Sequence, residues 1–208
     1  MEDQRVAELV SRSRNGDAAA WQSLTDRYTN LLWSVARSLR MNDADAADAV
    51  QTTWLRLVEN LDDIREPERL GSWLATTVRR ECFDIRRRSA RLRLGDPEDP
   101  VGWDPLVEAA DPLDYALLRD ERDAALWRAY GGLRPACQRL LRVLMADPAP
   151  TYAEVSAALD IAVGSIGPTR QRCLKCLRDL LLAEDVVIFG DAEPDGTPEP
   201  AETKGDGR

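Results

Sequence analysis

Histidine is absent from this 208-residue sequence, which excludes Ser-His and Cys-His catalysis and metal sites built on imidazole. The chain has only four cysteines, too few for a disulfide framework at this length. It has no apolar run near the ~18 residues of a membrane span, and residues 1–14 are charged throughout instead of forming the apolar centre of a signal peptide. These absences predict a soluble, cytoplasmic protein of a reducing compartment that carries no metal ion and no cofactor.

Charge is plentiful but unevenly placed. The formal net charge is -9, from 28 Lys and Arg against 37 Asp and Glu. Residues 42–63 and 96–123 are strongly acidic, whereas residues 65–95 hold nine arginines against four acids and residues 166–182 hold four basic side chains against one acid. A polyanion would therefore meet two basic segments inside an acidic protein. The alternative interpretation is that these runs are only solvated helix faces.

Apolar residues recur at helical spacing along most of the chain. Asn42 or Asp43 suits the N-cap of one helix and Ser72 that of another, while Pro135 suits a first helical turn. No stretch alternates over enough residues to indicate a sheet, and residues 96–112 combine four prolines with many acids. The predicted fold class is all-α, with two small helical domains joined by an acidic linker, the second a helix-turn-helix. The predicted boundaries are 1–93 for the first domain, 94–112 for the linker, 113–184 for the helix-turn-helix domain and 185–208 for an acidic disordered tail.

The sharpest local pattern lies in residues 151–182. Thr151 and Glu154 form a capping box, residues 160–164 a tight turn, and Ser165 the cap of a second helix with Pro168 in its first turn. A short helix, a tight turn and a longer helix with a basic outer face match the geometry that enters a DNA major groove. An ordinary helical hairpin is the alternative. The predicted DNA-binding residues of this motif are Ser165, Pro168, Thr169, Gln171, Arg172 and Lys175.

An arginine-rich helix is predicted over residues 72–88, with its basic side chains opposite Leu74, Val78 and Ile85. Phe83 falls among the arginines, where it could stack on a base while they hold phosphates. A kinked helix that turns Phe83 inward is equally compatible with the pattern.

The cysteines are predicted to be core residues. Cys173 and Cys176 form a C-x-x-C pair, but a metal or redox role would call for a second pair or an exposed thiolate. Cys173 falls on the apolar side of its helix, and Cys82 and Cys137 lie in apolar patterns.

Three segments, in this order, resemble a known family: residues 47–57 (ADAVQTTWLRL), residues 73–88 (beginning WLATTVRR) and residues 152–178 (beginning YAEV). They are similar to the bacterial RNA polymerase sigma factors of the small, two-domain, extracytoplasmic-function group. The resemblance implies a transcription initiation factor that directs core polymerase to promoters and helps to melt them. It implies as partners core RNA polymerase, through the clamp helices of the beta-prime subunit, promoter DNA, and an anti-sigma protein.

The resemblance also assigns roles to residues. The helix-turn-helix residues named above would read the minus-thirty-five element, and the loop at residues 66–70 would trap a base flipped out of the DNA. The polymerase-binding residues would be Asp48, Gln51, Thr52 and Leu55. The minus-ten DNA contacts would be Glu66, Pro67, Glu68, Arg69, Leu70, Arg79, Arg80, Phe83, Arg87 and Arg88.

Two rival interpretations remain open at the level of sequence. A stand-alone helix-turn-helix regulator would need only the C-terminal motif, and a helical interaction scaffold would have no nucleic-acid role. An enzyme is disfavoured, because the sequence has no histidine, no Gly-rich phosphate loop and no clear carboxylate cluster on one face.

Overall fold

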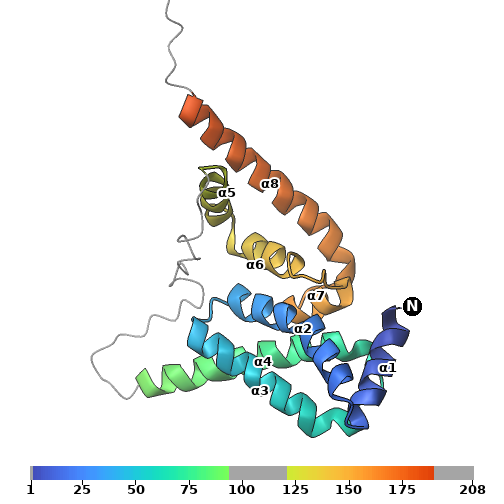
Figure 1. The fold of residues 1–208 in the computed structure, drawn as a ribbon. Helices are drawn as coiled ribbons and strands as arrows, with labels where there is room; N and C mark the ends of the chain where they lie inside the picture. The colour runs from blue at the N-terminus through green and yellow to red at the C-terminus, as the bar shows by residue number, and fades with distance from the viewer. Residues whose placement is uncertain (1, 94–120, 190–208) are drawn as a thin grey trace, which may run out of the picture.

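The computed structural model describes residues 2–93 and 121–189, and within them every regular element is a helix (Figure 1). This agrees with the predicted all-α class. Residues 94–120 and 190–208, which include the predicted linker and most of the predicted tail, lie outside the described residues. The first module contains α1 (Glu2–Arg14), α2 (Ala18–Ser38), α3 (Asp43–Asn60), η1 (Leu61–Asp63), η2 (Pro67–Arg69) and α4 (Leu70–Arg93). The second module contains α5 (Glu121–Gly131), α6 (Pro135–Leu144), α7 (Tyr152–Leu159) and α8 (Val163–Phe189).

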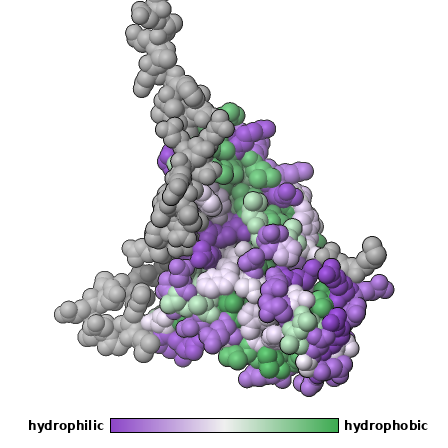
Figure 2. Space-filling model, viewed as in Figure 1, coloured by the Kyte–Doolittle hydropathy of each residue, from purple (hydrophilic) through white to green (hydrophobic). Residues whose placement is uncertain are grey.

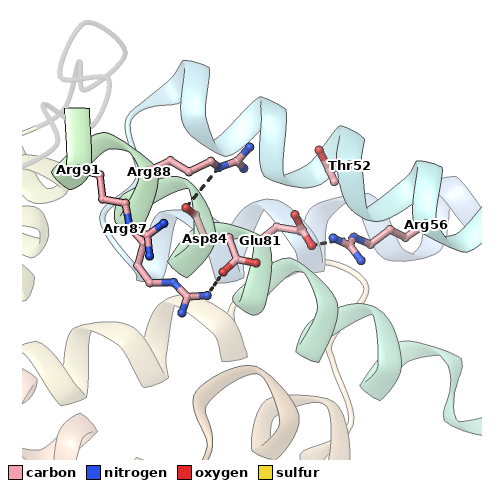
Figure 3. A pocket seen from close by; sticks show the side chains of 7 residues that line it. All are labelled: Thr52, Arg56, Glu81, Asp84, Arg87, Arg88 and Arg91. Carbon is pink, nitrogen blue, oxygen red and sulfur yellow. Dashed lines mark hydrogen bonds and ion pairs between the residues drawn. The ribbon is translucent and has the colours of Figure 1, made fainter.

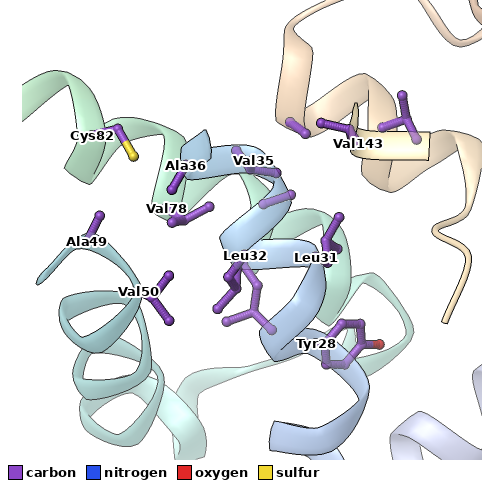
Figure 4. Packing of buried hydrophobic residues seen from close by; sticks show 14 of the residues in the cluster. Tyr28, Leu31, Leu32, Val35, Ala36, Ala49, Val50, Val78, Cys82 and Val143 are labelled. Atoms are coloured by element: carbon purple, nitrogen blue, oxygen red, sulfur yellow. The ribbon is translucent and has the colours of Figure 1, made fainter. Parts of the chain in front are cut away.

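Helix α2 is the centre of the first module, where it packs against α1, α3 and α4. Its Leu24, Leu32 and Val35 are fully buried, and Figure 4 shows Leu32 pointing toward Val50 of α3. Asp17 begins α2 by accepting hydrogen bonds from the backbone N–H groups of Ala19 and Ala20. Asn42 caps α3 as predicted, with its side chain accepting from the N–H of Asp45 at 2.8 Å.

Helix α4 begins earlier than predicted. The 3-10 turn η2 leads directly into Leu70, so Ser72 lies in the first turn of α4 and is not its N-cap. The 3-10 turn begins the helix in place of a capping side chain, because Leu70, the residue after the turn, already has helical backbone angles.

The second module is built around α8, which packs against α5, α6 and α7. Pro135 occupies the first turn of α6, as predicted. Helix α8 continues to Phe189, so residues 185–189 are helical where the sequence predicts a disordered tail. No helix in the described part of the chain is long and apolar enough to cross a membrane.

The two modules are packed against each other, with α4 on α7 and α2 on α6 (Figure 1). Leu31, Val35 and Val143 belong to one continuous hydrophobic core that draws on both modules (Figure 4). Polar contacts border it: the Asn30 side chain donates to the carbonyl of Asp147 at 2.7 Å. The sequence alone predicts two tethered bodies, whereas the structure shows them closed on a shared core.

Candidate functional site

The first candidate surface is the outer face of α3. Asp48, Gln51 and Leu55 are exposed there, and Leu55 is 56% exposed although it is apolar. The spacing of three and four residues places them on one side of the helix. Thr52 is only half-buried and lies toward α4. Three of the four predicted polymerase contacts are thus available to a partner, and Leu55 adds an exposed apolar side chain to this face.

The loop before α4 differs in part from its predicted role. Glu66, Glu68 and Arg69 are exposed, and Arg69 forms an ion pair with Glu66 at 2.8 Å. Pro67 is half-buried at the start of η2. Leu70 is 1% exposed and belongs to the core, so its side chain is not accessible to DNA in this arrangement, and its predicted contact with DNA stays a prediction. The side chain is buried because Leu70 opens α4 rather than closing the loop.

The arginine face of α4 is largely open to solvent. Arg80, Arg87 and Arg88 are exposed, and Phe83 is 42% exposed. The guanidinium of Arg79 lies 5.6 Å from the ring centroid of Phe83, which is a cation–π distance. The helix therefore turns Phe83 outward among the arginines, and the inward alternative does not occur.

Arg79 has a second partner in the other module. Its guanidinium lies 2.7 Å from the carboxylate of Asp160, and the Arg79 side chain is only 25% exposed. A predicted minus-ten contact is therefore tied to the turn of the helix-turn-helix motif in this closed arrangement.

A basic pocket lies between α3 and α4 (Figure 3). Glu81, 5% exposed, forms an ion pair with Arg56 at 2.7 Å. Asp84 accepts a hydrogen bond from Arg87, and this bond lowers the pKa of the Asp84 carboxyl below its ordinary value. Four arginines against two carboxylates leave the pocket positive, which suits an anion such as a phosphate. The lining residues are Thr52, Arg56, Glu81, Asp84, Arg87, Arg88 and Arg91.

Two arginines of this pocket, Arg56 and Arg91, are not among the site residues predicted from the sequence. A signal for both was present. Arg56 follows Thr52 by four positions and Arg91 follows Arg87 by four, so each lies one helical turn from a residue already singled out.

The helix-turn-helix motif is present in α7 and α8. The predicted capping box exists in full: the Thr151 hydroxyl accepts from the N–H of Glu154, and the Glu154 carboxylate accepts from the N–H of Thr151 at 2.7 Å. Asp160 ends α7 in the left-handed conformation, with φ of 58°, which Asp tolerates better than most residues.

Helix α8 starts three residues earlier than predicted, at Val163 instead of Ile166. Ser165 is therefore inside the first turn and is not the N-cap; its hydroxyl donates to the carbonyl of Ala162 at 2.7 Å. Pro168 consequently falls in the second turn, inside the helix. Gly167 makes this possible, because a Cβ on the residue before proline would clash with the proline ring in helical geometry.

The outer face of α8 is available for contact. Ile166 and Cys173 are buried on the inner side. The predicted DNA-binding residues lie opposite: Ser165, Pro168, Gln171, Arg172 and Lys175 are exposed and Thr169 is half-buried. Figure 2 shows a mainly hydrophilic surface, with hydrophobic patches over the upper helices and along the lower edge of the first module.

The cysteines depart from their predicted role as simple core residues. Cys137 and Cys173 are joined by a disulfide, which the sequence analysis did not predict because their 36-residue separation carries no recognisable spacing. Cys82 is buried as predicted, and burial raises the pKa of its thiol to about 12. Cys176 is an exposed free thiol.

Comparisons with known proteins find relatives of this chain in a single family. Residues 24–92 match the Sigma-70 region 2 family. The chain is 30% identical to the ECF RNA polymerase sigma factor EcfG of Rhodopseudomonas palustris over 80% of this chain and 86% of the relative. It is 29% identical to the ECF RNA polymerase sigma factor SigE of Mycolicibacterium smegmatis over 80% of this chain, but spans only 64% of the relative's length.

A solved structure has the same fold. It is the co-crystal structure of the sigma factor RpoE with the anti-sigma factor NepR from Bartonella quintana, with a TM-score of 0.52 and 21% identity. The match covers 79% of this chain and 98% of that chain. At this identity the likeness concerns the fold alone.

Proposed function

The chain belongs to the ECF RNA polymerase sigma factors, and from this membership we propose that it is a transcription initiation factor that binds core RNA polymerase and directs it to specific promoters. The observation that carries the proposal is the exposed outer face of α8, with Gln171, Arg172 and Lys175 opposite the buried Ile166 and Cys173. Such a face can donate hydrogen bonds to base edges, each good bidentate pair contributing about 1–3 kcal/mol of discrimination.

The first module supplies the other two contacts of the proposal. The exposed face of α3 would dock on the clamp helices of the beta-prime subunit through Asp48, Gln51 and Leu55. The arginine face of α4 would hold the minus-ten DNA, with Phe83 stacked on a base and the basic pocket on a phosphate. The chemistry of RNA synthesis would belong to the polymerase, so no catalytic residue is needed in this chain.

A partner that keeps the factor inactive is part of the proposal. The similar RpoE structure is a complex with an anti-sigma factor. We expect an anti-sigma protein to bind this chain and to compete with polymerase for it.

Run-off transcription with core polymerase on genomic promoter fragments tests the proposal. Adding the factor should produce transcripts from defined start sites that core polymerase alone does not make. No factor-dependent transcript on any fragment would contradict the proposed function.

A gel shift separates this function from that of a stand-alone helix-turn-helix regulator. The acidic average of the chain opposes DNA binding by the free factor. We therefore expect specific binding only when core polymerase is present. Tight, sequence-specific binding by the free protein would favour the regulator instead.

A further inference from the structure

The disulfide joins two helices of the DNA-reading module. Cys137 is in the first turn of α6 and Cys173 lies within α8, with their Cα atoms 5.4 Å apart. Both side chains are buried, at 5% and 1% exposure. The bond closes a covalent loop that contains most of α6, all of α7, the turn after it and the first part of α8.

The two remaining cysteines differ sharply in access. Cys176 is exposed and lies three residues after Cys173 on α8. Residues three apart on a helix are neighbours, with Cβ atoms about 5–6 Å apart. Cys82 lies buried in the other module, and its raised pKa keeps it a protonated, unreactive thiol. One accessible thiol therefore stands beside one buried cysteine pair.

We propose that Cys137 and Cys173 form a reversible thiol–disulfide switch in the second module, and that the exposed Cys176 is the thiol through which it exchanges with low-molecular-weight disulfides. The switch controls how firmly the recognition helix is held on α6.

The exchange balances with one external disulfide as the only reactant from outside the chain. The Cys176 thiolate attacks an external disulfide, forming a mixed disulfide and releasing one external thiolate. The Cys173 thiolate then attacks the Cys176 sulfur and releases the second external thiolate. Finally the Cys137 thiolate attacks the Cys173 sulfur and expels the Cys176 thiolate. Two electrons pass from the cysteine pair to the external disulfide, and a dithiol reductant reverses the sequence.

The disulfide has a structural consequence because α6 contacts both α8 and the first module. Helix α6 packs both on α8 and on α2 of the first module. The disulfide therefore fixes the recognition helix to the element that also forms the interface between modules. Reduction removes this constraint and leaves α8 held by side-chain packing alone.

Thiol mapping and thermal unfolding of the full chain test the switch. After oxidation with excess oxidised glutathione, peptide mapping should find residues 137 and 173 cross-linked, and dithiothreitol should release them. Loop-closure entropy for a 36-residue separation predicts that reduction lowers the melting temperature by about 10 °C. Absence of the cross-link after oxidation, or equal melting temperatures in the two states, would overturn the proposal.

Variants separate the switch from the relay thiol. The double variant Cys137→Ala/Cys173→Ala should lose the response of its melting temperature to dithiothreitol. Cys176→Ser should form the disulfide at least tenfold more slowly, with the melting temperature of the oxidised form unchanged. Cys82→Ala is the matched control and should oxidise at the wild-type rate. An unchanged rate in Cys176→Ser would remove Cys176 from the mechanism.

The consequence for transcription rests on the proposed function. Factor-dependent transcription should fall severalfold on reduction of the wild type and should not respond to reduction in the double variant. The mapping and melting experiments use neither polymerase nor DNA. A chain that switches but never supports transcription would therefore contradict only the proposed function.

Discussion

The individual arginines of α4 differ in what they are bound to. Arg79 is tied to Asp160 and 25% exposed, whereas Arg87 is 72% exposed and paired with Asp84 on its own helix. An exposed ion pair of this kind contributes little to stability. Arg87 can therefore exchange Asp84 for a phosphate at small cost, while Arg79 must first leave the second module.

Arg87 gives a prediction about salt. If its guanidinium contacts one phosphate in the polymerase–promoter complex, Arg87→Ala should reduce the slope of log affinity against log salt by about 1. Arg172→Ala should have the same effect at the minus-thirty-five element. Arg5→Ala is the control, because Arg5 is exposed on α1 and lies on none of the proposed surfaces. Unchanged slopes for both Arg87→Ala and Arg172→Ala would exclude phosphate contacts by these residues.

Asp17 gives a prediction about pH. The hydrogen bond from Arg12, followed by those from backbone N–H groups of α2, lowers the pKa of this carboxyl below 3.8. A lowered pKa in the folded state means that the charged form stabilises the protein above about pH 4 and that this contribution is lost as the pH falls below it. Asp17→Asn keeps an N-cap side chain but removes the charge. The melting temperatures of the two proteins should therefore differ at pH 6 and converge below pH 3.8; a constant difference would contradict the assignment.

At the scale of elements, the start of α7 depends on one side-chain pair. Thr151 and Glu154 satisfy each other's backbone N–H groups, and Glu154 is 8% exposed. Thr151→Ala removes the acceptor for the N–H of Glu154 and should lower the free energy of unfolding by about 1 kcal/mol. Thr151→Ser should lose only a few tenths of that. Denaturant unfolding measures both, and an equal loss in the two variants would show that the hydroxyl is not the cause.

The elements that the sequence predicts well are those whose signal is local. The capping residues Asn42 and Thr151 and the first-turn Pro135 act within four residues of their own position, so the sequence alone identifies them. Ser72 and Ser165 are residues of a type that caps helices, but neither is an N-cap. The 3-10 turn η2 leads into α4 before Ser72, and α8 already starts at Val163, before Ser165.

The features that the sequence does not predict depend on contacts between distant residues. Helix α1 is not among the predicted elements, although Val6 and Val10 are four residues apart and buried. Most of their neighbours in the sequence are charged or polar, so the apolar face of α1 is recognised only from its packing against α2. The Cys137–Cys173 bond and the Arg79–Asp160 pair join positions 36 and 81 residues apart. Neither follows from periodicity. The disulfide depends on the packing of α6 against α8, and the Arg79–Asp160 pair depends on the packing of the two modules against each other.

At the scale of the whole molecule, the closed arrangement conflicts with the proposed simultaneous reading of both promoter elements. Elements centred near positions -10 and -35 are separated by about 25 base pairs, or roughly 85 Å of B-form DNA at about 3.4 Å per pair. In the closed form α4 and the turn after α7 are in direct contact through Arg79 and Asp160 at 2.7 Å. We therefore expect the modules to separate when polymerase and promoter are bound, and the shared core to oppose that step in the free chain.

Gly71 offers the sharpest test of this packing. A Cβ at Gly71 would lie 1.9 Å from the Glu154 carboxylate of the other module. Alanine is the better helix former by about 1 kcal/mol, so Gly71→Ala should strengthen α4 itself. The clash should outweigh that gain, because Glu154 is buried and held in its capping box. We expect a net loss of roughly 1–3 kcal/mol in the free energy of unfolding, together with a larger radius of gyration in solution scattering.

Gly164→Ala is the matched control for Gly71→Ala, since it also replaces a helical glycine but a Cβ there meets nothing within 4 Å. This variant should be slightly stabilised and should keep the wild-type radius of gyration.

If the closed form competes with polymerase, Gly71→Ala should also support transcription at a lower factor concentration than the wild type, because less free energy is needed to separate the modules. Equal stabilisation of the two alanine variants, with no change in radius, would mean that α4 and α7 do not pack in this way in the free chain.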